Sequence, residues 1–73
     1  MRGDILLDDT YSRLYVVLSS RWSDKLSYTQ YKVLIIADWS TEEAPNHPGE
    51  RIDFGEGVHD DELVGHVELP ATM

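Results

Sequence analysis

Hydrophobic and polar positions along this chain mostly alternate, and that spacing predicts β-strands rather than helices. The densest apolar segment spans residues 29–38, where Val33, Ile35 and Ile36 supply a β-branched run. β-Branched side chains favour strands because their χ1 angles are stiff, although a helix is the competing interpretation of a short apolar run. The continuous apolar centre predicts a strand buried on both faces.

Four further segments have strand patterns. Residues 3–8 and 13–19 are joined by Asp9-Thr10-Tyr11-Ser12, which is a turn too short for a crossover, so we expect an antiparallel pair. Residues 51–54 alternate in polarity. Residues 64–69 alternate as well, with Val67 and Leu69 expected to face inward.

The segments between these strands are more polar. We expect residues 20–28 to form a loop or a wide hairpin tip and residues 40–50 an acidic loop, with Pro48-Gly49 at the centre of a type II turn. Asp60 is the expected cap of one helical turn over 60–63, and residues 70–73 are an expected frayed end.

Together these elements predict one mainly β domain over residues 1–73, a small SH3-like five-stranded antiparallel barrel with at most one short helical turn. An OB-like barrel is the alternative, but 73 residues are short for that barrel with its helix. A chain of this length has a small core, so a homodimer or a partner protein is one way to gain burial.

Charge changes this picture because it is unevenly distributed. Of the formal charge of −8, residues 1–37 carry five basic and four acidic side chains, whereas residues 38–73 carry only Arg51 against ten carboxylates. An acidic half repels phosphate backbones and favours contact with a basic protein surface. Direct nucleic-acid binding is therefore disfavoured, and the alternative role for the carboxylates is solubility alone.

Cysteine is absent, so disulfides and thiolate metal sites are excluded and a reducing cytoplasm is compatible with the chain. No apolar run approaches the roughly 20 residues that span a bilayer. We therefore expect a cytoplasmic protein without a membrane segment. Arg2-Gly3-Asp4 matches a cell-adhesion tripeptide, but three residues are a weak match and chance explains them.

Candidate chemistry is sparse. His59, Asp61 and His66 could in principle form a zinc ligand set, but their spacing matches no common metal motif. The chain has no nucleophile elbow and no phosphate-binding glycine loop. We therefore expect no metal and no cofactor.

One family resemblance comes from Gly3-Asp4-Ile5, from Arg13-Leu14-Tyr15-Val16-Val17-Leu18-Ser19 and from Val33-Leu34-Ile35-Ile36-Ala37-Asp38-Trp39-Ser40. Over residues 3–40 the chain resembles the MazF/PemK-type toxins, which are SH3-like, dimeric ribonucleases that cut single-stranded RNA without a metal. The resemblance implies a catalytic role for Arg13 and for the Ser40 hydroxyl. Leu14 replaces the family's proline, and the glycine-rich loop and the C-terminal helices are absent.

Two functional hypotheses follow. The first is a non-enzymatic acidic module that binds a basic surface of a target protein, as a phage-type or accessory regulator; nucleic-acid mimicry is a sharper version of it. Its expected binding residues are Trp22, Trp39, Glu42, Glu43, Glu50, Asp60, Asp61 and Glu62. Trp22 is expected either as an interface anchor or as a cap over the barrel mouth. The second hypothesis is a degenerate or minimal endoribonuclease that uses Arg13 and Ser40.

Overall fold

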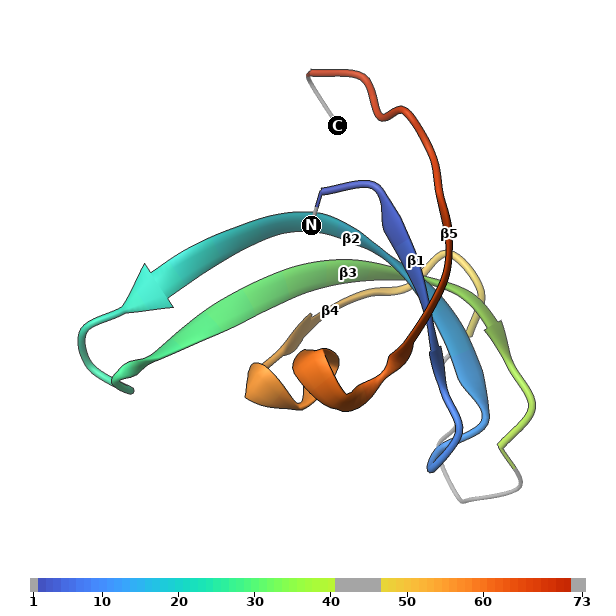
Figure 1. Ribbon diagram of the computed structural model, residues 1–73, viewed down its shortest axis with the longest axis horizontal. Helices are drawn as coiled ribbons and strands as arrows, with labels where there is room; N and C mark the ends of the chain where they lie inside the picture. The colour runs from blue at the N-terminus through green and yellow to red at the C-terminus, as the bar shows by residue number, and fades with distance from the viewer. Residues whose placement is uncertain (1, 41–46, 72–73) are drawn as a thin grey trace.

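The computed structural model describes residues 2–40 and 47–71 of the chain. These described residues form five strands and one 3-10 helix, in the order β1 (Asp4–Asp8), β2 (Arg13–Ser23), β3 (Tyr28–Asp38), β4 (Arg51–Phe54), η1 (Glu56–Asp60) and β5 (Glu62–His66). The strands form one antiparallel sheet in the order β4-β3-β2-β1-β5 (Figure 1). The prediction of a mainly β domain with five strands is confirmed. No pairing joins β4 to β5 in the described residues, so this sheet is not closed.

The longest ladder joins β2 to β3, whose outer half projects from the body as a curved two-stranded arm (Figure 1). Of the two structures expected over residues 20–28, the loop is wrong, and the hairpin has a narrower tip than expected, because β2 continues to Ser23 and the turn occupies only residues 24–27. Main-chain hydrogen bonds hold these polar positions in register. At the other end of β2, the turn predicted over residues 9–12 is confirmed.

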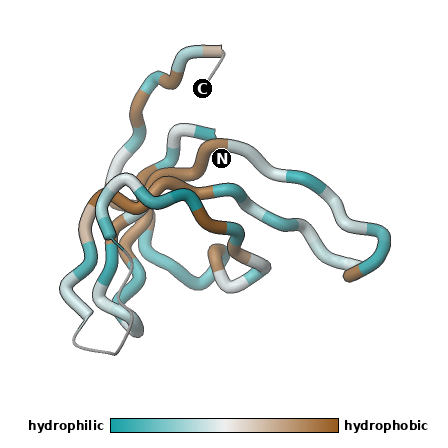
Figure 2. The backbone as a smooth tube through the Cα atoms, turned by 180° about the vertical axis from the view of Figure 1, so that it is seen from behind, coloured by the Kyte–Doolittle hydropathy of each residue, from teal (hydrophilic) through white to brown (hydrophobic). Residues whose placement is uncertain are grey.

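The core lies at the centre of the sheet, which is also the most hydrophobic part of the chain in Figure 2. Its buried members are Leu6, Tyr15, Val17, Tyr31, Val33, Ile35 and Val58. Burial in β3 alternates, since Tyr31, Val33 and Ile35 are buried whereas Lys32 and Ile36 are exposed. The prediction that this strand is buried on both faces is wrong, because little covers its second face.

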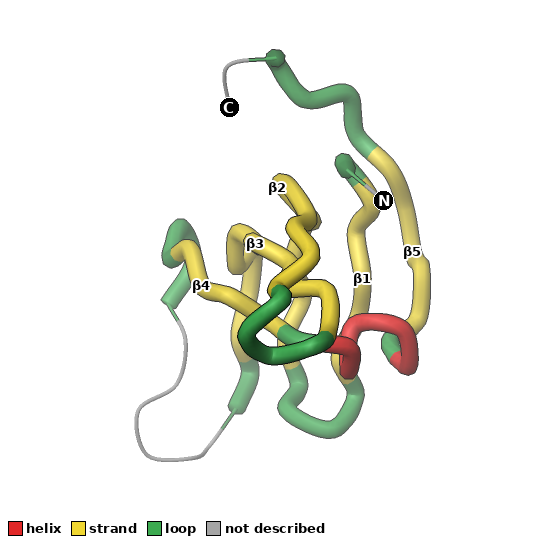
Figure 3. Tube along the Cα trace, turned by 90° about the vertical axis from the view of Figure 1, so that its left-hand side faces the viewer, coloured by secondary structure: helices red, strands yellow, loops and turns green. Residues whose placement is uncertain are grey.

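The chain after β4 differs from the expected pattern. A 3-10 helix spans Glu56–Asp60 and places Val58 in the core, so the helical turn predicted over 60–63 is wrong and Asp60 ends the helix instead of capping its start. The last strand is Glu62–His66, which is earlier than the predicted 64–69. Val67 lies beyond it and is 39% exposed. In Figure 3, η1 connects the two edge strands β4 and β5.

Two tight features agree with the sequence. Gly49 has φ +90°, and the Glu50 N–H donates to the His47 carbonyl at 3.1 Å, which confirms a type II turn at Pro48-Gly49. Gly3 also has φ +90°, and a Cβ there would lie 2.3 Å from the Val67 carbonyl oxygen, so only glycine fits.

The Arg2-Gly3-Asp4 tripeptide is part of the fold. Arg2 donates to the carbonyls of Leu18 and Pro70, and Asp4 Oδ1 lies 2.9 Å from His66 Nδ1. These contacts tie the first residues to β2 and to the segment after β5.

Candidate functional site

A cleft of about 410 Å³ opens beside the core, between the β1–β2 turn and η1. Asp8, Thr10, Tyr11 and Arg13 line it on one side. The other side is formed by Asp53, Phe54, Gly55, Gly57, Val58, Asp60 and Asp61. The polar groups that converge in this cleft make it the first candidate site.

Asp8 is a buried residue that lines the cleft. It is only 6% exposed, and its carboxylate accepts hydrogen bonds from the backbone N–H groups of Thr10 and Tyr11 at 3.1 and 3.2 Å. Its second oxygen accepts from Arg13 Nε at 3.1 Å. An aspartate at the end of a strand bonds the following backbone readily, which is why the chain turns here. The buried carboxylate of Asp8 thus accepts three hydrogen bonds.

Three side chains contact the Arg13 guanidinium. Besides its ion pair with Asp8, its guanidinium carbon lies 5.0 Å from the ring centroid of Tyr11 and 4.4 Å from that of Phe54. Both distances are in the range of cation–π attraction. The charge of this arginine is therefore already engaged by groups of the protein itself.

Tyr15 links the cleft to the core. Its side chain is fully buried and its ring packs edge-on against Phe54 at 4.9 Å, while its hydroxyl donates to Asp61. Burial raises the pKa of Tyr15 far above its usual range, and the hydrogen bond to Asp61 raises it further, so the hydroxyl stays a donor.

The pKa of Asp61 is subject to opposing effects. Burial raises the pKa of this carboxyl, the Tyr15 hydrogen bond lowers it, and the neighbouring Asp8 charge raises it again; the net direction is upward. Asp8, Asp60 and Asp61 thus line the cleft together with one arginine that Asp8 already neutralises. The cleft suits a cation better than an anion.

The structure brings some predicted residues together. Arg13 pairs in register with Asp38, and the Trp39 N–H donates to the Ser12 carbonyl at 2.7 Å, so Arg13 and Ser40 lie toward the same end of the β2–β3 ladder. The Ser40 N–H donates to Asp38 Oδ1 at 2.7 Å. Ser40 does not line the cleft that Arg13 lines.

The predicted binding residues are dispersed. Asp60 and Asp61 line the cleft, but Glu62 begins β5, and Glu50 accepts from the His47 N–H at 2.9 Å in the turn before β4. Trp22 is 58% exposed on the arm, with its indole N–H bonded to Asp24, so it does not cap a barrel mouth. Trp39 is 60% exposed at the opposite end of the ladder. Glu42 and Glu43 lie outside the described residues.

The histidines considered for zinc have separate partners. His59 Nε2 lies 2.9 Å from the Tyr31 hydroxyl, whereas His66 is beside Asp4. Within residues 2–40 and 47–71, no three histidine, aspartate or glutamate side chains come together as a metal site, and no helix is long and apolar enough to cross a membrane.

Sequence reasoning missed Asp8, Tyr11, Tyr15 and Phe54 as parts of the site. The Asp8 turn had a local signal, since an aspartate followed by Asp-Thr-Tyr-Ser favours side-chain bonding to the backbone. Tyr15 had none, because its partner Asp61 is 46 positions away. Comparison of the chain with models of protein families, with curated proteins and with solved structures finds no match.

Proposed function

We propose that this protein is a non-enzymatic binding module that docks on a basic surface of a target protein, with the acidic cleft as the seat for a lysine or arginine side chain of that target. One observation carries the proposal. The only cationic side chain that lines the cleft is already bound to Asp8, while Asp60 and Asp61 have no cationic partner within 4.0 Å among the described residues. An incoming cation would complete the charge balance.

The net charge of −8 supports the same kind of partner. A strongly negative surface accelerates association with a basic protein and selects against acidic ones, and both effects weaken with salt. In this proposal the module acts as a phage-type or accessory regulator by covering a basic surface. Mimicry of nucleic acid is the sharper version, in which the covered surface is one that otherwise holds a phosphate backbone.

Trp39 is the apolar anchor that best fits this docking face. It lies at the end of β3 that is bonded to the β1–β2 turn, and 60% of it is exposed. Exposed tryptophans commonly dominate the energetics of protein interfaces. Trp22 lies at the far end of the ladder and is a less suitable anchor for a partner seated at the cleft.

The scaffold that we propose for this module is an SH3-like barrel. The strand order β4-β3-β2-β1-β5 leaves β4 and β5 as the two edges, and η1 connects them while Val58 packs into the core. The connection of the two edge strands through a short helix that packs on the core is what supports the barrel.

A hexalysine peptide provides a defined probe for the cleft. Titrated into ¹⁵N-labelled protein at low salt, it is expected to shift the amide signals of residues 8–13 and 53–61 and to lose its effect at high salt. Asp60→Asn should weaken binding by about fivefold, whereas Glu68→Gln, which removes the same charge outside the cleft, should weaken it by less than about twofold. Equal weakening by both variants, or shifts spread over the whole surface, would show that no specific cationic seat exists.

The rival function is a minimal endoribonuclease, and it is kept because the ladder places Arg13 and Ser40 toward one end. An RNA phosphate would have to compete with Asp8 for the Arg13 guanidinium and to approach Asp60 and Asp61. Incubation with a long single-stranded RNA in the presence of chelator decides between the two functions. Cleavage that is lost in Arg13→Lys and in Ser40→Ala would support the nuclease, and absence of cleavage would remove it.

A further inference from the structure

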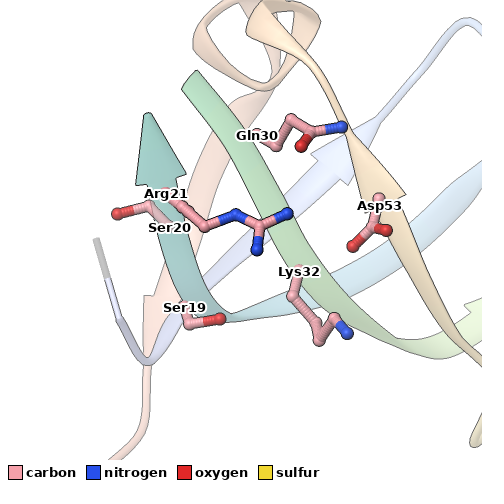
Figure 4. A pocket seen from close by; sticks show the side chains of 6 residues that line it. All are labelled: Ser19, Ser20, Arg21, Gln30, Lys32 and Asp53. Carbon is pink, nitrogen blue, oxygen red and sulfur yellow. The ribbon is translucent and has the colours of Figure 1, made fainter. Parts of the chain in front are cut away.

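A second cavity of about 210 Å³ lies at the arm and shares one lining residue, Asp53, with the acidic cleft (Figure 4). Its lining residues are all polar or charged, and they come from β2, β3 and β4. The lining residues are Ser19, Ser20, Arg21, Gln30, Lys32 and Asp53.

Strand register explains why these side chains meet. Ser19 pairs with Lys32, and Lys32 pairs with Asp53, so these three form one row across the sheet. Arg21 pairs with Gln30 in a second row, two positions further along both strands. Residues two apart in a strand share a face, so both rows lie on the face opposite the core residues Tyr31 and Val33.

The charges of the cavity are not balanced by ion pairs. Arg21 and Lys32 are exposed, and no ion pair in the described part of the chain involves either of them. Figure 4 shows their cationic groups directed into the space that Asp53 faces from β4. Two cations against one carboxylate leave a positive cavity in a protein whose net charge is −8.

We propose that this cavity binds a phosphate group. Arginine offers a planar fork of donors and lysine a point charge, and both are common ligands of phosphate oxygens. The Ser19 hydroxyl and the Gln30 amide supply further donors from the two rows. Donors that converge from two neighbouring strands, β2 and β3, suit a tetrahedral anion better than a planar carboxylate.

The size of the cavity limits what enters it. At about 210 Å³ it is smaller than the roughly 300–1,000 Å³ of pockets that enclose whole small molecules. A free phosphate or the phosphate of an ester fits, with the rest of an ester remaining in solvent. Asp53 opposes the anion and keeps the affinity modest.

This inference does not rest on the proposed function. Apart from Asp53, which lines both, the acidic cleft and the phosphate cavity share no charged residue. Failure of hexalysine to bind would leave the phosphate cavity untouched, and failure of phosphate to bind would leave the cleft untouched.

The test is a titration of ¹⁵N-labelled protein with sodium phosphate at pH 7.5, with sodium chloride holding the ionic strength constant. We expect saturable shifts of the amide signals of residues 19–21 and 30–32. O-Phosphoserine should produce the same shifts if esters enter as well as free phosphate, and acetate should produce none. Absence of saturable shifts, or equal shifts with acetate, would overturn the proposal.

Variants make the test specific. Arg21→Ala and Lys32→Ala should each weaken phosphate binding at least about fivefold, whereas Lys25→Ala, at the tip of the same arm, should leave it within about twofold. Asp53→Asn should tighten binding, because Asp53 is the only acidic side chain among the described residues that line the cavity. All four positions are exposed, so folding is preserved and is checked by the unchanged remainder of the spectrum. Phosphate binding that is insensitive to Arg21 and Lys32 would contradict the assignment.

Discussion

Arg13 and Arg21 lie in the same strand, yet the structure places them in opposite situations. Arg13 begins β2 beside the core, where Asp8 and two aromatic rings hold its charge. Arg21 lies near the other end, on the arm, where it is exposed and forms no ion pair with any residue that the structure describes. One strand thus carries a cation committed to the fold and a cation available to a ligand.

The two arginines differ because Arg13 is partly buried and Arg21 is exposed, since the residue type is the same. Near the core, water is excluded, and an unpaired charge there costs several kcal/mol, so every polar group needs a partner. All buried side-chain nitrogen and oxygen atoms in the described residues have one. On the arm, the charged groups of Arg21 and Lys32 are exposed to water, so they stay without an ion pair in the described residues at little cost. Exposed, unpaired charges are therefore the better indication of a binding surface in this protein.

The most direct test of this comparison between Arg13 and Arg21 is to make the same substitution at both positions. Arg13→Ala leaves Asp8 buried without its cation and removes the two ring contacts, so we expect a loss of about 3–5 kcal/mol in the free energy of unfolding. Arg21→Ala should change it by less than about 0.5 kcal/mol. Urea denaturation followed by circular dichroism measures both. Similar losses at the two positions would show that depth does not separate them.

A second pair of substitutions compares two tyrosines at the cleft. Tyr15→Phe removes the hydroxyl that donates to Asp61, and we expect a loss of about 1–2 kcal/mol because the carboxylate loses a buried donor. Tyr11→Phe is the matched control, since Tyr11 is 47% exposed, and it should be nearly neutral. If the two variants unfold at the same urea concentration, the Tyr15 hydroxyl contributes nothing to stability.

The smallest expected effect concerns the charge of Asp61. Its folded pKa is raised above the unfolded value, mainly by burial, so its ionised form destabilises the folded state above that raised pKa. This penalty is relieved as the pH falls through the folded pKa toward the unfolded value of 3.8. Asp61→Asn keeps an acceptor for Tyr15 and removes the charge. We therefore expect the variant to melt at the same or a higher temperature than the wild type at pH 7.

The pH dependence distinguishes this effect from a general one. The difference in melting temperature between Asp61→Asn and the wild type should shrink as the pH is lowered from 7 toward 4. Glu68→Gln, at an exposed position, should show no such trend. A difference that grows on acidification would contradict the raised pKa.

Much of the fold followed from local pattern. The alternation over 51–54 predicted β4 with its observed bounds, and the turn at Pro48-Gly49 followed from the conformations that proline and glycine favour. The arm was missed because residues 20–23 have no buried face, so hydrophobic periodicity carries no signal there. The 3-10 helix was missed because one buried side chain, Val58, fixes it, and a single apolar residue has no period.

The site was less predictable than the fold. Arg13, Asp60 and Asp61 were anticipated, but by different hypotheses, and only the tertiary structure brings them to one cleft. The phosphate cavity depends on strand register, because Ser19, Lys32 and Asp53 become neighbours only when three strands pair. A one-residue slip would place each of them on the other face of the sheet. Sequence composition indicates charge, but register decides where it gathers.

The position of Asp53 would connect the binding of the two proposed ligands thermodynamically. It lines both cavities, so a cation seated in the cleft would offset part of its negative charge and would thereby favour an anion on the arm. Such coupling is reciprocal, and phosphate must then strengthen the binding of a cation to the same degree. Asp53→Asn uncouples the two events. A single exposed carboxylate would thus make this small sheet respond to two ligands of opposite charge as one system.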